Sequence, residues 1–117
     1  MIKGVHTMFY TSDPEGLRAF FRDKLGFPFV DVGDNWLIFD LPEADLGCHP
    51  ASNTAGETNG TPSISFYCED IESTMKELKE KGVEFTGLPE NHGYGLVTHM
   101  KAPGGLMIQL YQALYKK

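Results

Sequence analysis

The sequence predicts an α+β fold: two βαβββ modules in tandem that form a curved, cleft-containing mixed sheet with helices on its outer face. Three observations support this prediction. A chain of 117 residues has the size of one domain. Its 13 glycines and 7 prolines indicate many turns between short strands. A motif near the N-terminus also recurs about halfway along the chain, which is typical of an internal duplication.

The duplication is clearest in two blocks. The motif FYxxDxE at residues 9–15 returns at residues 66–72, and GFPF at residues 26–29 corresponds to GVEF at residues 82–85. Both blocks flank equivalent predicted elements, so chance similarity is a poor explanation. We therefore divide the domain, at 1–117, into three parts. These are a first module at 1–49, a polar linker at 50–62 and a second module at 63–117.

The first module begins with an apolar run at 5–10 that predicts a strand. Asp13 is a good helix N-cap, and Pro14 suits the first helical position, where its missing N–H costs nothing. Apolar residues then recur at helical spacing up to Gly26, a residue type that commonly ends helices. Three further strands are predicted at 27–32, 35–40 and 45–49.

The second module repeats this order. A strand at 63–68 is followed by Asp70, which predicts a second helix N-cap. Apolar residues at helical spacing continue to Gly82, which predicts the end of that helix. Three strands are again predicted, at 83–88, 95–100 and 106–111.

The composition excludes several classes of partner. The chain has 10 Lys and Arg against 16 Asp and Glu residues, a net charge of −6, and Lys116-Lys117 is its one basic cluster. Nucleic-acid binding needs the opposite charge and is therefore excluded. Because no signal peptide or long apolar run is present, we expect a cytoplasmic protein without membrane contact. Cys48 and Cys68 have no metal or redox spacing and are expected to be reduced thiols.

Alternation along the strands predicts one polar sheet face that mixes hydroxyl, amide, imidazole and apolar groups. Such a mixture suits a small-molecule cleft. Two alternatives stay open: the face is buried in a dimer, or its groups hydrogen-bond one another inside a closed sheet. The residues expected on this face are His6, Met8, Tyr10, Ser63, Ser65, Tyr67, Met107, Gln109 and Tyr111.

Three further residues are candidates for the cleft. His92 and Tyr94 lie in the glycine-flanked segment NHGYG, which is either a loop that closes over a ligand or an ordinary hairpin turn. Trp36, the only tryptophan, either stacks on a ligand or fills the core.

Paired modules of these proportions resemble the vicinal oxygen chelate superfamily, which includes glyoxalase I, extradiol dioxygenases, fosfomycin-resistance enzymes and bleomycin-resistance proteins. The resemblance extends over residues 5–112. Its most specific stretches are ISFYCEDIESTMKELKEKGVEF at 64–85 and APGGLMIQLYQ at 102–112. The resemblance supports the tandem modules but says little about activity, because this fold hosts many reactions.

The resemblance implies a divalent metal (Fe, Ni, Zn or Mn) held from the first and last strands of each module. The matching positions make His6, His49 and Gln109 the candidate ligands. Ser63 stands where a second histidine is usual, and Gln109 stands where a glutamate is usual. An amide is a weaker, neutral donor and cannot act as a general base, so the usual glyoxalase I chemistry is disfavoured.

Two functions remain open after these departures. The first is a metal-dependent enzyme of the superfamily, a lyase, isomerase or dioxygenase that acts on an oxygen-rich small molecule. The second is a metal-free protein of the bleomycin-resistance type that sequesters its ligand. Both functions imply a small-molecule partner. Because family members cover their concave faces by pairing modules, the resemblance also implies a two-fold symmetric homodimer.

Overall fold

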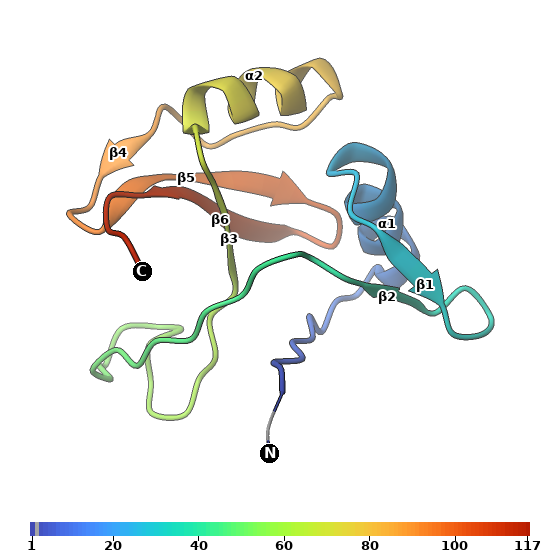
Figure 1. Ribbon diagram of the computed structural model, residues 1–117, viewed down its shortest axis with the longest axis horizontal. Coiled ribbons are helices and arrows are strands. Elements are labelled where there is room, and N and C mark those ends of the chain that lie inside the picture. The colour runs from blue at the N-terminus through green and yellow to red at the C-terminus, as the bar shows by residue number, and fades with distance from the viewer. Residues whose placement is uncertain (2) are drawn as a thin grey trace.

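The computed structural model describes residue 1 and residues 3–117 of the chain, shown in Figure 1. Two helical regions and two separate sheets make up its regular structure. In chain order the elements are α1 (Pro14–Ala19), a π-helical turn η1 (Phe20–Lys24), β1 (Phe29–Asp31), β2 (Leu37–Phe39), β3 (Ser65–Cys68), α2 (Ile71–Glu80), β4 (Glu90–Asn91), β5 (Gly95–Ala102) and β6 (Leu106–Ala113).

The second half of the chain folds as one strand, one helix and three strands, which confirms the predicted order. Its four-stranded sheet has the order β3-β6-β5-β4. The β3–β6 pair is parallel, whereas β6, β5 and β4 pair in antiparallel fashion. Helix α2 lies over one face of this sheet, as Figure 1 shows. The mixed α+β class predicted from the sequence is therefore correct.

The strand predicted at 83–88 is wrong in extent. Only Phe85 forms a β-bridge, to Met100 on β5, although backbone hydrogen bonds from this segment reach β5 on either side of the bridge. Gly87 and Pro89 explain why the ladder stops: glycine weakens a strand, and proline has no N–H to donate. Pairing resumes at β4, where Glu90 lies opposite Val97.

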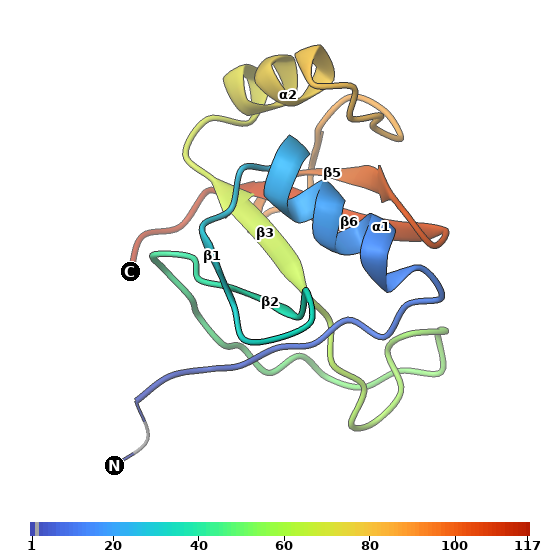
Figure 2. The same cartoon turned by 90° about the vertical axis from the view of Figure 1, so that its right-hand side faces the viewer.

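The first half differs more from the prediction. Its hairpin, β1 and β2, forms where strands were expected, with Phe29 opposite Phe39. The strands predicted at 5–10 and 45–49 do not form. A strand needs a neighbour to complete its hydrogen-bond ladder, and alternation in the sequence does not supply one. Figure 2 shows the N-terminal segment reaching α1 without joining a sheet.

Both predicted helix starts are confirmed. The side chain of Asp13 accepts a hydrogen bond from the N–H of Gly16, and that of Asp70 accepts one from the N–H of Glu72. Each carboxylate satisfies a backbone donor that has no partner within the helix. The first helix changes to π geometry before it ends at Gly26, which has φ +70°. This change of pitch was not predicted.

The core lies between the helices and the apolar face of the four-stranded sheet. Its buried side chains come from both halves of the chain, so the halves share one core. They are Leu17, Phe20, Phe21, Ile71, Met75, Val83, Met100, Ile108 and Leu110. Among the described residues, no helix is long and apolar enough to cross a membrane.

Candidate functional site: the polar sheet face

The strand register defines the face of the sheet that points away from this core. Ser65 lies opposite Gln109, and Tyr67 lies opposite Tyr111, across the β3–β6 pair. On the other side of β6, His99 lies opposite Gln109. Directly opposed residues share a face. These five residues therefore point to one side, while the alternating apolar residues of β6 point into the core.

Three tyrosines, Tyr67, Tyr94 and Tyr111, form the centre of this side, and we call them the tyrosine face. The Tyr111 ring centroid lies 5.8 Å from that of Tyr67 and 5.6 Å from that of Tyr94. Gly95 makes this packing possible, because a Cβ at that position would lie 3.0 Å from a Tyr111 ring carbon. The amide nitrogen of Gln109 donates to the Tyr94 hydroxyl at 3.0 Å. Ring contacts and one hydrogen bond thus hold the aromatic surface in place.

Tyr111 is the anchor of the tyrosine face, because it is only 8% exposed while its hydroxyl lies 2.9 Å from that of Tyr115. Burial, followed by the hydrogen bond with Tyr115, raises the pKa of the Tyr111 phenol above its usual value. The Tyr111 phenol therefore stays protonated to a higher pH than an exposed tyrosine does and keeps its hydrogen bond with Tyr115.

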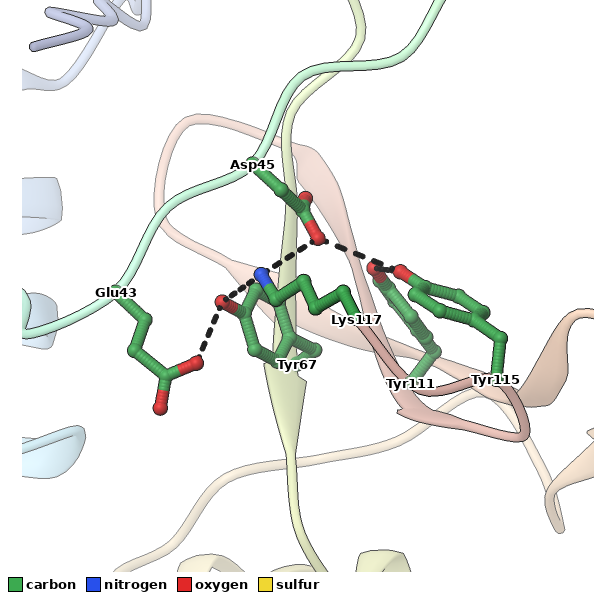
Figure 3. A network of polar contacts seen from close by, with 6 residues as sticks. All are labelled: Glu43, Asp45, Tyr67, Tyr111, Tyr115 and Lys117. Atoms are coloured by element: carbon green, nitrogen blue, oxygen red, sulfur yellow. Dashed lines mark hydrogen bonds and ion pairs between the residues drawn. The ribbon is translucent and has the colours of Figure 1, made fainter.

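A polar network adjoins the tyrosine face and is drawn in Figure 3. The Lys117 ammonium donates to a carboxylate oxygen of Asp45 at 2.9 Å and to the Tyr67 hydroxyl at 3.1 Å. The Tyr67 hydroxyl in turn donates to Glu43 at 3.2 Å. Sequence reasoning missed Glu43, Asp45, Tyr115 and Lys117. Asp45 and Lys117 are 72 positions apart, and no local pattern signals that they meet.

Six of the residues predicted for the cleft lie on the polar face or belong to the tyrosine face. Ser65, Tyr67, Gln109 and Tyr111 lie on the polar face, and Met107 alternates with Gln109 on β6 to lie on the same side. Tyr94 joins them through its ring contact with Tyr111.

The other predicted cleft residues lie elsewhere or at the rim. Trp36 is half-exposed at the β1–β2 hairpin, where the Arg18 guanidinium lies 4.9 Å from the centroid of its ring. His92 lies beside the tyrosine face, with its ring 6.3 Å from that of Tyr94 and its Nε2 3.4 Å from Glu90. The remaining three are exposed residues outside any strand: Met8, Tyr10 and Ser63.

The three expected metal ligands do not form a ready site. His6 and His49 are exposed on segments without strands, and the His49 Nδ1 lies 2.9 Å from the Pro50 carbonyl oxygen. Gln109 already donates to Tyr94. Across residue 1 and residues 3–117, no three His, Cys, Asp or Glu side chains gather where they could hold a metal ion. As they lie here, these three residues do not fit a divalent cation, and calorimetry tests whether the protein binds one.

Calorimetry with Zn²⁺, Ni²⁺ or Mn²⁺ is expected to show no tight binding by the wild-type protein. The reason is that Ser63 and Gln109 offer neutral oxygens, which are weaker ligands than imidazole or carboxylate and do not neutralise the charge of the cation. The double variant Ser63→His/Gln109→Glu supplies an imidazole and a carboxylate and is expected to gain a site. Tight binding by the wild type that disappears in His6→Ala would contradict this expectation.

Two shallow hollows lie away from the polar face. One, of about 350 Å³, lies between the first helix and the β5–β6 turn and is lined by Phe20, Lys24 and Lys101 among others. The other, of about 510 Å³, lies beside α2 near Leu88 and Pro89. No residue predicted for the site lines either hollow, so neither supports the predicted cleft.

The fold is that of a glyoxalase-like protein. The chain belongs to the Glyoxalase/Bleomycin resistance protein/Dioxygenase superfamily, whose family model matches residues 3–110. It is 31% identical to the uncharacterized protein YetH of Bacillus subtilis (strain 168) in an alignment of 113 positions. The alignment covers 90% of this chain and 94% of that protein.

Solved structures show the same fold. TnmS3, an antibiotic binding protein from Streptomyces sp. CB03234, is 22% identical with a TM-score of 0.63, and the match covers 97% of this chain and 99% of TnmS3. A superfamily member from Sphaerobacter thermophilus DSM 20745 is 26% identical with a TM-score of 0.61, and the match covers 95% of this chain and 98% of that one. The resemblance read from the sequence is therefore correct.

Proposed function

We propose that the protein binds a small planar or aromatic molecule on the tyrosine face without a metal, in the manner of a sequestering protein. One observation supports this proposal above all: the ring packing of Tyr67, Tyr111 and Tyr94, with the Gln109 amide tied to the Tyr94 hydroxyl. Aromatic rings supply a large contact area and favour offset or edge contacts with another ring. Hydroxyl and amide groups at their edge orient the ligand.

Preorganisation makes this surface suited to binding. Tyr111 is buried and supports the rings of Tyr67 and Tyr94, so a ligand that packs on those two rings does not have to order a mobile side chain. Binding loses less free energy when the side chains at the interface are already ordered. The antibiotic-binding function of TnmS3 also shows that this fold can hold a small molecule, although 22% identity relates the two proteins by fold alone.

The experiment follows the binding of a neutral aromatic probe, 2-naphthylmethanol, by its fluorescence. Tyr94→Leu removes one ring of the tyrosine face and is expected to weaken binding by about tenfold. This loss corresponds to the free energy that one aromatic contact contributes in addition to its buried surface area. Gln109→Ala is expected to weaken binding by about 2- to 10-fold, since it releases the Tyr94 hydroxyl. Neither variant is expected to lower the melting temperature appreciably, because both side chains lie at the open surface of the sheet.

Gln112 provides the matched control for the amide substitution. Its side-chain oxygen accepts a hydrogen bond from the N–H of Ile71 at 3.0 Å, at the start of α2. Gln112→Ala leaves that partly buried donor without its partner and is expected to cost about 1–3 kcal/mol of stability with no change in probe affinity. If Gln109→Ala behaves like Gln112→Ala, losing stability and keeping affinity, the polar face is a structural surface and the proposed function is wrong.

A further inference from the structure

The ammonium of Lys117 occupies a defined environment at the edge of the tyrosine face. Its Nζ lies 2.9 Å from Asp45 Oδ2 and 3.1 Å from the Tyr67 hydroxyl oxygen. It also lies 5.0 Å from the centroid of the Tyr67 ring, a distance typical of a cation–π contact. One carboxylate, one hydroxyl and one aromatic face therefore contact the same cation.

The groups behind these contacts are also acidic or phenolic. Glu43 accepts a hydrogen bond from Tyr67, and the Tyr115 hydroxyl lies 3.5 Å from Asp45. We call Glu43, Asp45, Tyr67 and Tyr115 the ammonium cage; Figure 3 shows them together with Tyr111 and Lys117. Asp45 contacts the ammonium directly, and Glu43 is linked to it through the Tyr67 hydroxyl. Two carboxylates therefore stand against one ammonium, and the cage keeps a net negative charge even when it is filled.

The Lys117 ammonium, which fills the cage, is easily displaced from it. Lys117 lies beyond the end of β6, outside any helix or strand, and its side chain is 48% exposed. An ion pair this exposed adds little to the stability of a fold. Its four-carbon stem also has many rotamers that become accessible once the ammonium leaves the cage. A second ammonium can therefore replace it at small cost.

We propose that the ammonium cage binds the protonated amine of the small-molecule ligand, and that Lys117 holds this place when the ligand is absent. The inference rests on the proposed function and names its ligand class: a planar or aromatic molecule that carries a primary amine. Tyr67 belongs to both surfaces, and its ring lies 5.8 Å from that of Tyr111. An amine in the cage thus places an attached ring system beside the tyrosine face.

The test compares two probes of the same shape, the cation 2-naphthylmethylammonium and the neutral 2-naphthylmethanol. Lys117→Met removes the resident ammonium but keeps an unbranched side chain. We expect the variant to bind the cation about tenfold more tightly than the wild type does, because the cation no longer competes with Lys117. The affinity for the neutral alcohol is expected to change less than about twofold.

Lys116→Met is the matched control, since it makes the same change in net charge one residue away. It is expected to leave the affinity for both probes unchanged. Asp45→Asn in the Lys117→Met background keeps the shape of the cage but removes the carboxylate that contacts the ammonium, and is expected to abolish the preference for the cation. Far-UV circular dichroism on each variant confirms that the fold is retained.

The outcomes separate this inference from the proposed function. If the alcohol binds the wild type but Lys117→Met gains no preference for the cation, the cage is not an amine site and the proposed function stands. An equal gain in Lys116→Met would show a general charge effect and would also overturn the inference. A third outcome is that the alcohol binds no variant, whereas the cation binds Lys117→Met but not Lys117→Met/Asp45→Asn. In that case the amine site stands and the proposed function of the tyrosine face fails.

Discussion

Replacement of Phe21 by alanine is expected to lower the free energy of unfolding by about 3–5 kcal/mol, the usual cost of removing a buried phenylalanine ring. Phe21 is 7% exposed. Its ring centroid lies 5.8 Å from Phe9, 5.7 Å from Phe27, 5.5 Å from Phe39 and 5.7 Å from Phe66. Because Phe66 belongs to β3 and the other three belong to the first half, this ring joins the two halves of the chain.

Urea denaturation followed by circular dichroism measures this loss. Phe29→Ala is the matched control, since Phe29 is 43% exposed and has a ring contact with Phe39 at 6.1 Å. It is expected to cost about 1 kcal/mol or less, as surface substitutions usually do. Equal losses in the two variants would mean that the aromatic cluster does not join the halves. A loss confined to Phe21→Ala supports one cooperative core.

In solution the protein is expected to sediment at about twice the 13.0 kDa mass of the single chain. Strand β3 lies at the edge of the four-stranded sheet, and in the described part of the chain it pairs only with β6. Val5, Met8 and Leu46 are exposed on segments that the sequence pattern predicts to be strands. Unpaired edges and exposed apolar segments are surfaces that a second copy can cover.

Sedimentation equilibrium at tens of micromolar measures the assembly. The double variant Val5→Lys/Met8→Lys places two charges on the N-terminal segment and is expected to shift the protein toward the single-chain mass, with its helical content unchanged. Asn53→Lys, in the polar linker, adds one charge elsewhere and is expected to leave the assembly intact. A wild-type protein that sediments as a single chain at this concentration would contradict the prediction.

The helices and the second module could be predicted because their signals are local. Asp13 and Asp70 each bond a backbone N–H two or three residues away, so the cap is visible within a short stretch of sequence. Gly26 and Gly82 both have positive φ, a conformation that glycine adopts without strain, and both end helices as expected. The π-helical turn was missed because it keeps the same apolar residues facing inward and leaves no compositional signal.

The polar sheet face could be predicted in part. Alternation alone places Gln109 and Tyr111 on one side of β6, and the internal repeat relates Tyr67 to the same layer. The sequence does not contain the register that sets Tyr67 against Tyr111, or the ring packing that brings Tyr94 beside them. His6, Met8 and Tyr10 were expected on this face because a strand was expected, and that strand does not form in the single chain.

The sequence by itself determined the fold class, the superfamily, both helix caps and the polar character of one sheet face, since each depends on neighbouring residues or on a periodic pattern. Only the tertiary structure decided which segments find strand partners, and only it brought Lys117 to Asp45 and Tyr67. The physical reason is that hydrogen-bond ladders and ion pairs depend on proximity in space. No periodic pattern encodes a contact across 72 positions between two segments that have no regular structure.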